Sequence, residues 1–160
     1  MKSPSPIEIL NTELRKDPPV DLDKVAFRLG LGVRYREDLP DNVAGAILPE
    51  AREISPSGYT ILINAKDNPR KRRFTLAYEI AHYVLHGDLI SGGVTDDANY
   101  HSALGETYVL EAKRLAADIL MPAPLVKSLY APHGDVGELG QKFSVSGDAM
   151  ALRLKDLGLV

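Results

Sequence analysis

A short stretch of the chain combines tyrosine, glutamate and histidine at the spacing of a metal-binding helix. Residues 74–86 read F-T-L-A-Y-E-I-A-H-Y-V-L-H. In the H-E-x-x-H motif, two histidines one helical turn apart bind zinc, and the glutamate after the first histidine acts as general base. Glu79 and His82 keep the second half of this motif, but Tyr78 stands where the first histidine belongs. The stretch therefore predicts a zinc hydrolase site with one altered ligand.

The geometry of a helix groups the candidate ligands on one face. Residues four positions apart lie on the same side of an α-helix, so Tyr78, His82 and His86 form one stripe. A third zinc ligand must then come from another element, while water takes the fourth position. Glu111, on the next long predicted helix, would complete a His/His/Glu set. Glu79 is placed to take a proton from the bound water and is the candidate catalytic residue.

Three interpretations of Tyr78 remain open. The phenol could ligate zinc as a phenolate, which requires loss of a proton whose usual pKa is about 10. The site could instead shift, with His82, His86 and Glu111 as the ligands. Alternatively, the pocket could hold no metal, with a charge-assisted pair between His82 and Glu111 and a hydrogen bond from Tyr78 to Glu111.

Each of these residues also has an ordinary structural explanation. Glu79 alone would be a solvated acid, and His82 alone a buried, hydrogen-bonded histidine. Glu111 near a helix start and His86 near a helix end would both favour the helix dipole. Only their arrangement as a set points to a site. The two other histidines, His101 and His133, fall in predicted loops, where we expect them to be solvated.

Composition narrows the class of protein. The chain has 160 residues, of which 44% are hydrophobic and 26% charged, and a net charge of −3. These values are typical of one globular domain spanning 1–160, and they give no basic field for nucleic acid. The absence of cysteine excludes disulfides, thiolate ligands and cysteine nucleophiles. No apolar run has the length of a signal peptide or a membrane span, so we expect a cytoplasmic protein.

The elements around the motif predict an α+β fold. A small antiparallel sheet of three strands comes early, because short turns join its strands. A long glycine-rich loop, 88–105, follows the motif helix and resembles a mobile rim. In the last helix, Met150, Leu152, Leu154 and Leu157 are expected to be partly buried. The predicted strands are 31–36, 43–48 and 59–64, and the predicted helices begin at about 6, 22, 69, 106, 125, 135 and 147.

Four consecutive cations, 70–73, occupy the first turns of the motif helix. Positive charge at a helix N-terminus opposes the helix dipole, so these residues are not placed there for helix stability. We favour a solvated charged face. The alternative is an anionic partner such as nucleic acid, for which four charges in an acidic chain are weak support.

Three motifs in order resemble the ImmA/IrrE family of zinc-dependent metallopeptidases. Residues 72–87 read R-R-F-T-L-A-Y-E-I-A-H-Y-V-L-H-G, where the family typically has R-F-T-L-A-H-E-x-x-H. Residues 111–122 read E-A-K-R-L-A-A-D-I-L-M-P, similar to the family's E-A-N-x-F-A-A-x-L-L-M-P. The segment 18–33 and the tail from 143 onwards also resemble family members, so the similarity covers nearly the whole chain.

The resemblance implies a compact zincin-like fold and a specific activity. The resemblance implies a protein encoded on a mobile element, prophage or stress locus that cleaves or otherwise inactivates a helix-turn-helix repressor, in some cases as part of a toxin–antitoxin-like pair. The implied metal ligands are position 78, His82 and Glu111, with Glu79 as general base. We therefore expect a zinc metallo-endopeptidase acting on a helix-turn-helix regulator or antitoxin. The alternative is an inactive, metal-free relative that works by protein–protein binding. Direct contact with nucleic acid or a membrane is not expected.

Overall fold

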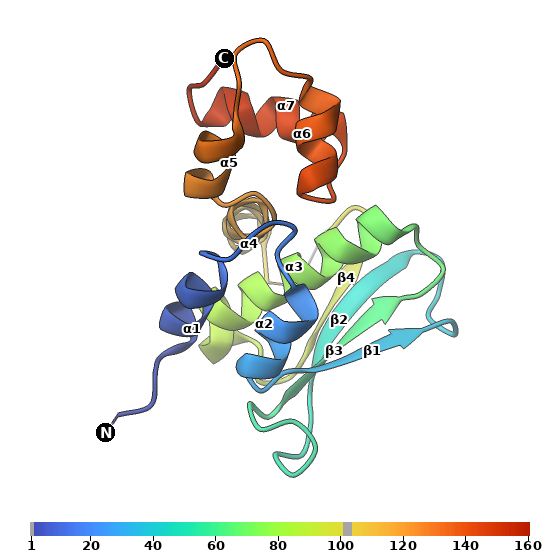
Figure 1. Ribbon diagram of the computed structural model, residues 1–160. Helices are drawn as coiled ribbons and strands as arrows, with labels where there is room; N and C mark the ends of the chain where they lie inside the picture. Colours follow the sequence, from blue (N-terminus) through green and yellow to red (C-terminus); the bar gives the residue numbers. More distant parts are fainter. Residues whose placement is uncertain (1, 101–103) are drawn as a thin grey trace.

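Helix α3 (Pro69–His86) runs through the centre of the molecule, between a sheet on one side and helices on the other (Figure 1). The computed structural model describes residues 2–100 and 104–160. The predicted α+β architecture is confirmed. The remaining helices are α1 (Pro6–Glu13), α2 (Leu22–Arg28), a 3₁₀ turn η1 (Gly87–Leu89), α4 (Glu106–Leu120), α5 (Ala123–Leu129), α6 (Val136–Lys142) and α7 (Gly147–Asp156).

Local sequence signals fix where α3 begins and ends. The Asn68 side chain accepts a hydrogen bond from the backbone N–H of Lys71, at 2.9 Å, and Pro69 occupies the first helical turn. Asparagine is a strong N-cap, and proline at the first position costs the helix no hydrogen bond. Gly87 follows as the C-cap. Between these caps, residues 75–82 are all buried, because the sheet and α4 enclose the middle turns of the helix.

The sheet has four strands in the order β1-β3-β2-β4, where three antiparallel strands were predicted. The strands are β1 (Gly32–Arg36), β2 (Val43–Pro49), β3 (Tyr59–Asn64) and β4 (Val94–Asp97). β2 runs antiparallel to both of its neighbours, but β1 runs parallel to β3. The antiparallel prediction was wrong for β1, because β3 inserts between β1 and β2 and the connection 37–42 passes over it.

The fourth strand, β4, lies inside the segment that was predicted to be one long loop. Its sequence, V-T-D-D, has two aspartates, which are depleted in strands. The strand forms because it pairs with β2 at the edge of the sheet, with a bulge between Val43 and Gly45. Val94 and Asp96 point inward and are buried. His101, which was predicted to be solvated in a loop, lies outside the described residues.

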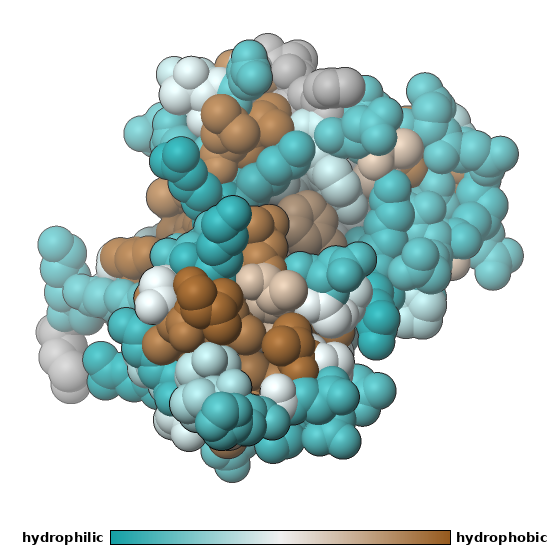
Figure 2. Space-filling view, turned by 90° about the horizontal axis from the view of Figure 1, so that it is seen from above, coloured by the Kyte–Doolittle hydropathy of each residue, from teal (hydrophilic) through white to brown (hydrophobic). Residues whose placement is uncertain are grey.

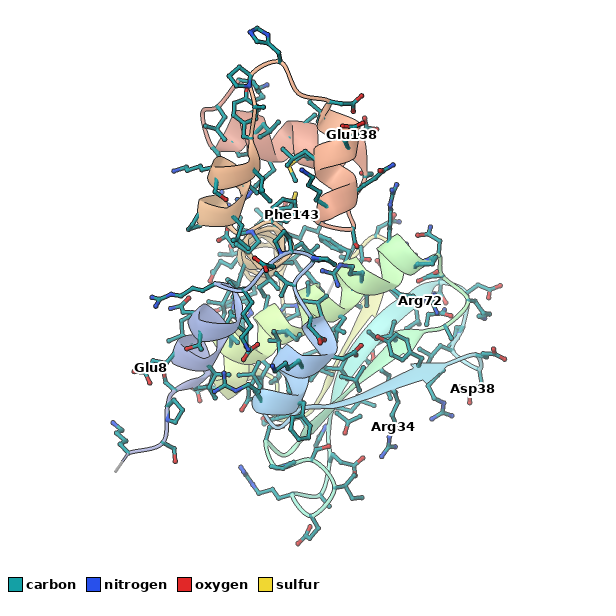
Figure 3. All side chains as sticks on the ribbon, in the orientation of Figure 1. Glu8, Arg34, Asp38, Arg72, Glu138 and Phe143 are labelled. Atoms are coloured by element: carbon teal, nitrogen blue, oxygen red, sulfur yellow. The ribbon has the colours of Figure 1, made fainter. Side chains whose placement is uncertain are left out.

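The C-terminal helices α5, α6 and α7 lie beyond α4, on the side away from the sheet (Figure 1). Phe143, at the turn between α6 and α7, is fully buried and lies near α4 (Figure 3). The view from above, onto these helices, shows apolar residues in the middle of the face with hydrophilic residues around them (Figure 2). Leu152 of α7 is 61% exposed, although its helical spacing predicted partial burial. His133 is exposed, as predicted.

One cluster of buried apolar side chains, which includes Leu10, Ile61, Ile80, Ile119 and Leu154, connects all parts of this architecture. Helix α3 is packed against β2, β3 and α4, so its middle turns are enclosed on both sides. Within residues 2–100 and 104–160, no helix has the length and apolar character that crossing a membrane requires.

Candidate functional site

The predicted stripe on α3 forms, and it is buried. Tyr78 and His82 are 0% exposed and His86 is 4% exposed. The ring of Tyr78 lies edge-on to that of His82, with centroids 4.6 Å apart, and the rings of His82 and His86 are 5.1 Å apart. The helix therefore brings the three side chains into one row inside the molecule.

The two histidines contact each other through their ring nitrogens. Nδ1 of His82 lies 2.9 Å from Nδ1 of His86, and Nε2 of His86 lies 3.4 Å from Oε2 of Glu111 on α4. Burial and the neighbouring His86 lower the pKa of His82 to about 4, so its imidazole is neutral at pH 7. Glu111 pairs with His86 and not, as one interpretation expected, with His82. The extra turn of helix places His86 nearer to α4.

Tyr78 faces away from Glu111. Its hydroxyl lies 3.4 Å from Oδ1 of Asp96 on β4 and 3.5 Å from the carbonyl oxygen of Tyr100. The rings of Phe74 and Tyr100 pack beside it. Burial and the nearby carboxylates raise the pKa of Tyr78 well above its ordinary value, because both disfavour the phenolate. The predicted hydrogen bond from Tyr78 to Glu111 was wrong, because the phenol reaches the sheet and not α4.

Glu79, the candidate general base, is 0% exposed and points at the sheet beside Asp96. Burial and the Asp96 carboxyl raise the pKa of Glu79 well above its ordinary value, so the pair favours one shared negative charge over two. Gly45 of β2 lies beside Glu79 and allows a close approach of β3 and α3, to the backbone oxygen of Leu62 and the side chain of Thr75. A Cβ atom there would lie 2.7 Å from the backbone oxygen of Leu62 and 3.7 Å from Oε1 of Glu79.

One edge of the cluster reaches the surface. Glu111 is 46% exposed, and the ring of Tyr108, which is 37% exposed, lies edge-on over His86 at 5.1 Å. The other members, Tyr78, Glu79 and His82, lie inside. The cluster is therefore accessible to solvent at its α4 side and not at the side that faces the sheet.

The described residues do not fit the zinc centre that the motif predicts. Such a centre needs three donors directed at one point. Tyr78, at the first ligand position, is instead directed at Asp96, and the two histidines are directed at each other. Accordingly, no three His, Asp or Glu side chains in the described parts of the chain converge as metal ligands. One donor is still available, because Nε2 of His82 is buried and has no hydrogen-bond partner among those residues.

Sequence reasoning missed three residues of this site. Asp96 and Tyr100 lie in the segment predicted as a loop, and Gly45 was recognised only as a position of close approach or a bulge. A signal for Asp96 is the alternation V-T-D-D, which buries every second residue when the segment is a strand. No local pattern indicates that Asp96 meets Glu79, because that contact depends on the pairing of β4 with β2.

Comparison with known proteins agrees with the three motifs. A model of the IrrE N-terminal-like domain matches residues 28–155, which is most of the chain. The chain belongs to the IrrE N-terminal-like domain family. The predicted resemblance to the ImmA/IrrE family is thereby confirmed.

Two relatives within the IrrE family are named radiation response metalloproteases, a name that implies a bound metal in those proteins. The protein from Deinococcus radiodurans is 32% identical over 107 residues, and that from Deinococcus deserti is 32% identical over 105. These alignments cover 64% and 63% of this chain but only 33% and 37% of the relatives. The chain thus matches about a third of the length of either relative.

A solved structure shares the fold. A Mycobacterium tuberculosis transcriptional regulator superimposes with a TM-score of 0.60 at 17% identity. The match covers 93% of this chain and 46% of the regulator. At this identity the likeness establishes a shared fold alone.

Proposed function

We propose that this IrrE-type domain recognises a partner protein without hydrolysing it, and that the partner is a helix-turn-helix regulator or antitoxin. The observation that carries the proposal is the direction of Tyr78. Its side chain occupies the first ligand position of the motif, yet its hydroxyl is directed at Asp96 and turned from the His82–His86–Glu111 row. The position that should bind metal instead stabilises the sheet.

The chemistry of the neighbouring groups supports a binding role. A general base must be able to take a proton from water, but Glu79 is fully buried next to a second carboxyl group. A phenol binds zinc well only as phenolate, and the surroundings of Tyr78 disfavour that form. The burial of Glu79 and the disfavoured phenolate of Tyr78 both affect residues on which hydrolysis would depend, while the fold around them is intact.

The kind of partner follows from the family and from the fold. The family resemblance implies that the protein controls a repressor, on a mobile element or at a stress locus. A transcriptional regulator with the same fold supports a setting in gene control. A helix-turn-helix protein encoded beside this gene is therefore the first partner to test, including the antitoxin of a toxin–antitoxin pair.

A second candidate function is zinc-dependent cleavage of the same partner at a shifted site. The observation that favours it is the buried, unpartnered Nε2 of His82. Nδ1 of His82 contacts His86, and His86 contacts Glu111, so both imidazoles would have to turn towards a shared metal. These three residues would hold the metal, which would supply a Lewis acid and a water of lowered pKa. Tyr78 would take no part.

Zinc content and cleavage separate the two candidates. We would measure zinc per chain by mass spectrometry in the native protein, in Tyr78→His and in Glu111→Ala, all purified without added metal. The binding function predicts little zinc in the native protein, zinc gained in Tyr78→His, and a partner complex that survives chelator uncut. Near-stoichiometric zinc that is lost in Glu111→Ala, together with chelator-sensitive cleavage of the partner, would contradict it and show that a zinc site containing Glu111 works. Retention of that zinc in Tyr78→Phe would then assign it to the shifted site.

A further inference from the structure

A groove of about 580 Å³ opens between the first turns of α3, the second half of α4 and helix α7. The first turns of α3 lie below α6 and α7 in Figure 1. On α7 its lining residues follow one helical stripe, Ala149, Leu152, Arg153 and Asp156. Lys113, Ala117 and Leu120 form a matching stripe on α4. Two helix faces and the start of a third helix therefore enclose the groove.

The floor of the groove is apolar. It is formed by Phe74, Ala117, Leu120, Met121, Val145, Ala149 and Leu152. Leu152, although apolar, is 61% exposed. An exposed leucine beside small alanines leaves room for an apolar side chain from outside. Burial of Leu152 by a partner would remove apolar surface from water, which is favourable.

The rim of the groove is cationic, and most of its cations form no ion pair with a described carboxylate, although Lys71 donates to the carbonyl oxygen of Ala98 at 2.8 Å. Arg70, Lys71, Arg73, Lys113 and Arg153 line the rim, with Asp156 as the one acidic residue of the described lining. Of these cations only Arg153 forms an ion pair with a described carboxylate, Asp118, at 2.9 Å.

Arg73 is the most constrained of these cations. Its side chain donates one hydrogen bond, to the carbonyl oxygen of Val20 at 2.7 Å, and its Nε is buried without a partner among the described residues. Burial lowers its pKa, although the nearby carboxylates of Asp21 and Asp23 act in the opposite direction. Arg73 therefore already has acidic neighbours, and the exposed Arg70 is the freer cation of the rim.

We infer that this groove binds an acidic segment of a partner protein that presents apolar side chains to α4 and α7 and carboxylates to α3 and Lys113. The inference gives a role to the cations at the start of α3, which oppose the helix dipole and so do not stabilise the helix. It rests on the proposed function in one respect, that the occupant belongs to a protein partner. An apolar segment docked in a helical groove is a common mode of recognition.

The groove is continuous with the buried cluster. Phe74 of the groove floor stacks on Tyr78, with ring centroids 6.3 Å apart, and meets Tyr100 edge-on at 5.0 Å. Lys113 of the rim lies over the ring of Tyr100, at 6.0 Å. A segment lying in the groove would therefore pass beside the motif residues, where a substrate or a bound regulator would be expected to lie.

The apolar floor favours a protein segment over nucleic acid. Contact with a phosphate backbone needs a basic surface and gains little from buried leucine, methionine and valine. The whole chain is also acidic, with a net charge of −3. Nucleic acid is therefore an outcome that the experiment must test.

Three fluorescein-labelled synthetic peptides of equal length provide the probe. One is an amphipathic acidic peptide with leucines on one face, the second keeps the acids but replaces each leucine by serine, and the third keeps the leucines but replaces each acid by lysine. We expect fluorescence anisotropy to show that the first binds the full chain at least about tenfold more tightly than either of the others.

Pairs of matched variants, one inside and one outside the groove lining, test whether the acidic peptide binds in the groove. Ala149→Trp fills the groove and should weaken the acidic peptide about tenfold or more, whereas Ala151→Trp, on the same helix but outside the lining, should change it less than about twofold. Arg70→Glu should also weaken it, whereas Arg72→Glu should not, because Arg72 lines a different hollow with Tyr35. An acid at position 70 favours the helix dipole, so Arg70→Glu should remain folded.

Two results would overturn the inference. One is equal binding of the three peptides, or equal effects of the paired variants. The other is tight binding of duplex DNA that weakens steeply between about 50 and 200 mM salt and is lost in Arg70→Glu, which would assign the rim to phosphate. Peptide binding is independent of zinc and of cleavage, so its failure is distinguishable from failure of the proposed function.

Discussion

The hydroxyl of Tyr78 lies 3.4 Å from Oδ1 of Asp96, so the motif helix is attached to the edge strand β4 at the position where family members bind metal. Asp96 also lies beside Glu79. One aspartate on a short strand thus engages both of the motif residues on which hydrolysis would depend.

Removal of the Tyr78 hydroxyl should destabilise the protein. In Tyr78→Phe the ring still fills its place, but the buried Asp96 carboxyl loses a hydrogen-bond donor. We expect the free energy of unfolding to fall by about 1 kcal/mol in urea denaturation. Tyr108→Phe is the control, because that ring is 37% exposed and should leave stability nearly unchanged. Equal stability of native protein and Tyr78→Phe would show that the contact contributes nothing.

Replacement of Glu79 by glutamine should change how stability depends on pH. The pKa of Glu79 is raised in the folded state, so the folded protein holds a proton that the unfolded chain releases above its pKa of 4.5. Its contribution to stability is therefore complete below about pH 4.5 and falls as the pH rises towards the folded pKa.

Glu79→Gln removes this titration, since an amide stays neutral beside Asp96. We expect its stability curve between about pH 5 and 9, measured in chelating buffer, to be flatter than that of the native protein. A native curve that is equally flat would contradict the shared charge.

A methyl group at position 45 should be poorly tolerated. In Gly45→Ala the new Cβ would lie 2.7 Å from the backbone oxygen of Leu62 and 2.7 Å from Cγ2 of Thr75. Because neither the strand nor α3 can move freely, we expect a loss of about 1–3 kcal/mol in chemical denaturation. Gly92→Ala is the matched control, because nothing lies within 4 Å of a Cβ there. Similar losses in both variants would rule out a specific close approach.

The buried carboxylate of Glu13 provides a separate test on the acid side. Burial acts to raise its pKa, but hydrogen bonds from Arg28 and Lys16 outweigh burial and hold the pKa below its ordinary value of 4.5. Oε1 of Glu13 lies 2.7 Å from Arg28 and 3.1 Å from Lys16. Because the pKa of Glu13 is lower in the folded protein than in the unfolded chain, its ionised carboxylate stabilises the fold above pH 4.5. This stabilisation is lost as the pH falls through the pKa of the folded state.

We therefore expect Glu13→Gln to be less stable than the native protein at pH 7, with a difference that shrinks on acidification below about pH 4.5. Thermal unfolding across this range measures it. Glu53→Gln, at an exposed position, should follow the native curve throughout. A deficit that stayed constant down to pH 3 would mean that packing, and not charge, explains the role of Glu13.

The motif helix could be predicted from sequence because its signals are local. Asn68 and Pro69 mark its start and Gly87 its end, and the spacing of Tyr78, His82 and His86 sets one face. The same holds for β3, whose short run is rich in β-branched residues. The roles proposed for Glu79, His82 and Glu111 came from the family pattern and stay predictions.

The partners of these residues could not be predicted, because they depend on which strands meet. β4 is paired to β2 across about fifty residues of chain, and Asp96 lies opposite Gly45 only through that register and its bulge. The parallel pairing of β1 with β3 also depends on a crossing that no turn signal specifies. Sequence spacing placed both histidines on one face, but only packing decided that His86 would meet Glu111.

The hydrogen bonds that connect His82, His86 and Glu111 are all donated in one direction, from His82 towards Glu111. A carboxylate only accepts hydrogen bonds, so Nε2 of His86 must carry the hydrogen that faces Glu111. In neutral His86 the other nitrogen then accepts, and Nδ1 of His82 must donate to it across 2.9 Å. This leaves Nε2 of His82 with a bare lone pair, enclosed in the core. A half-exposed carboxylate on α4 thus selects the tautomer of an imidazole that water does not reach.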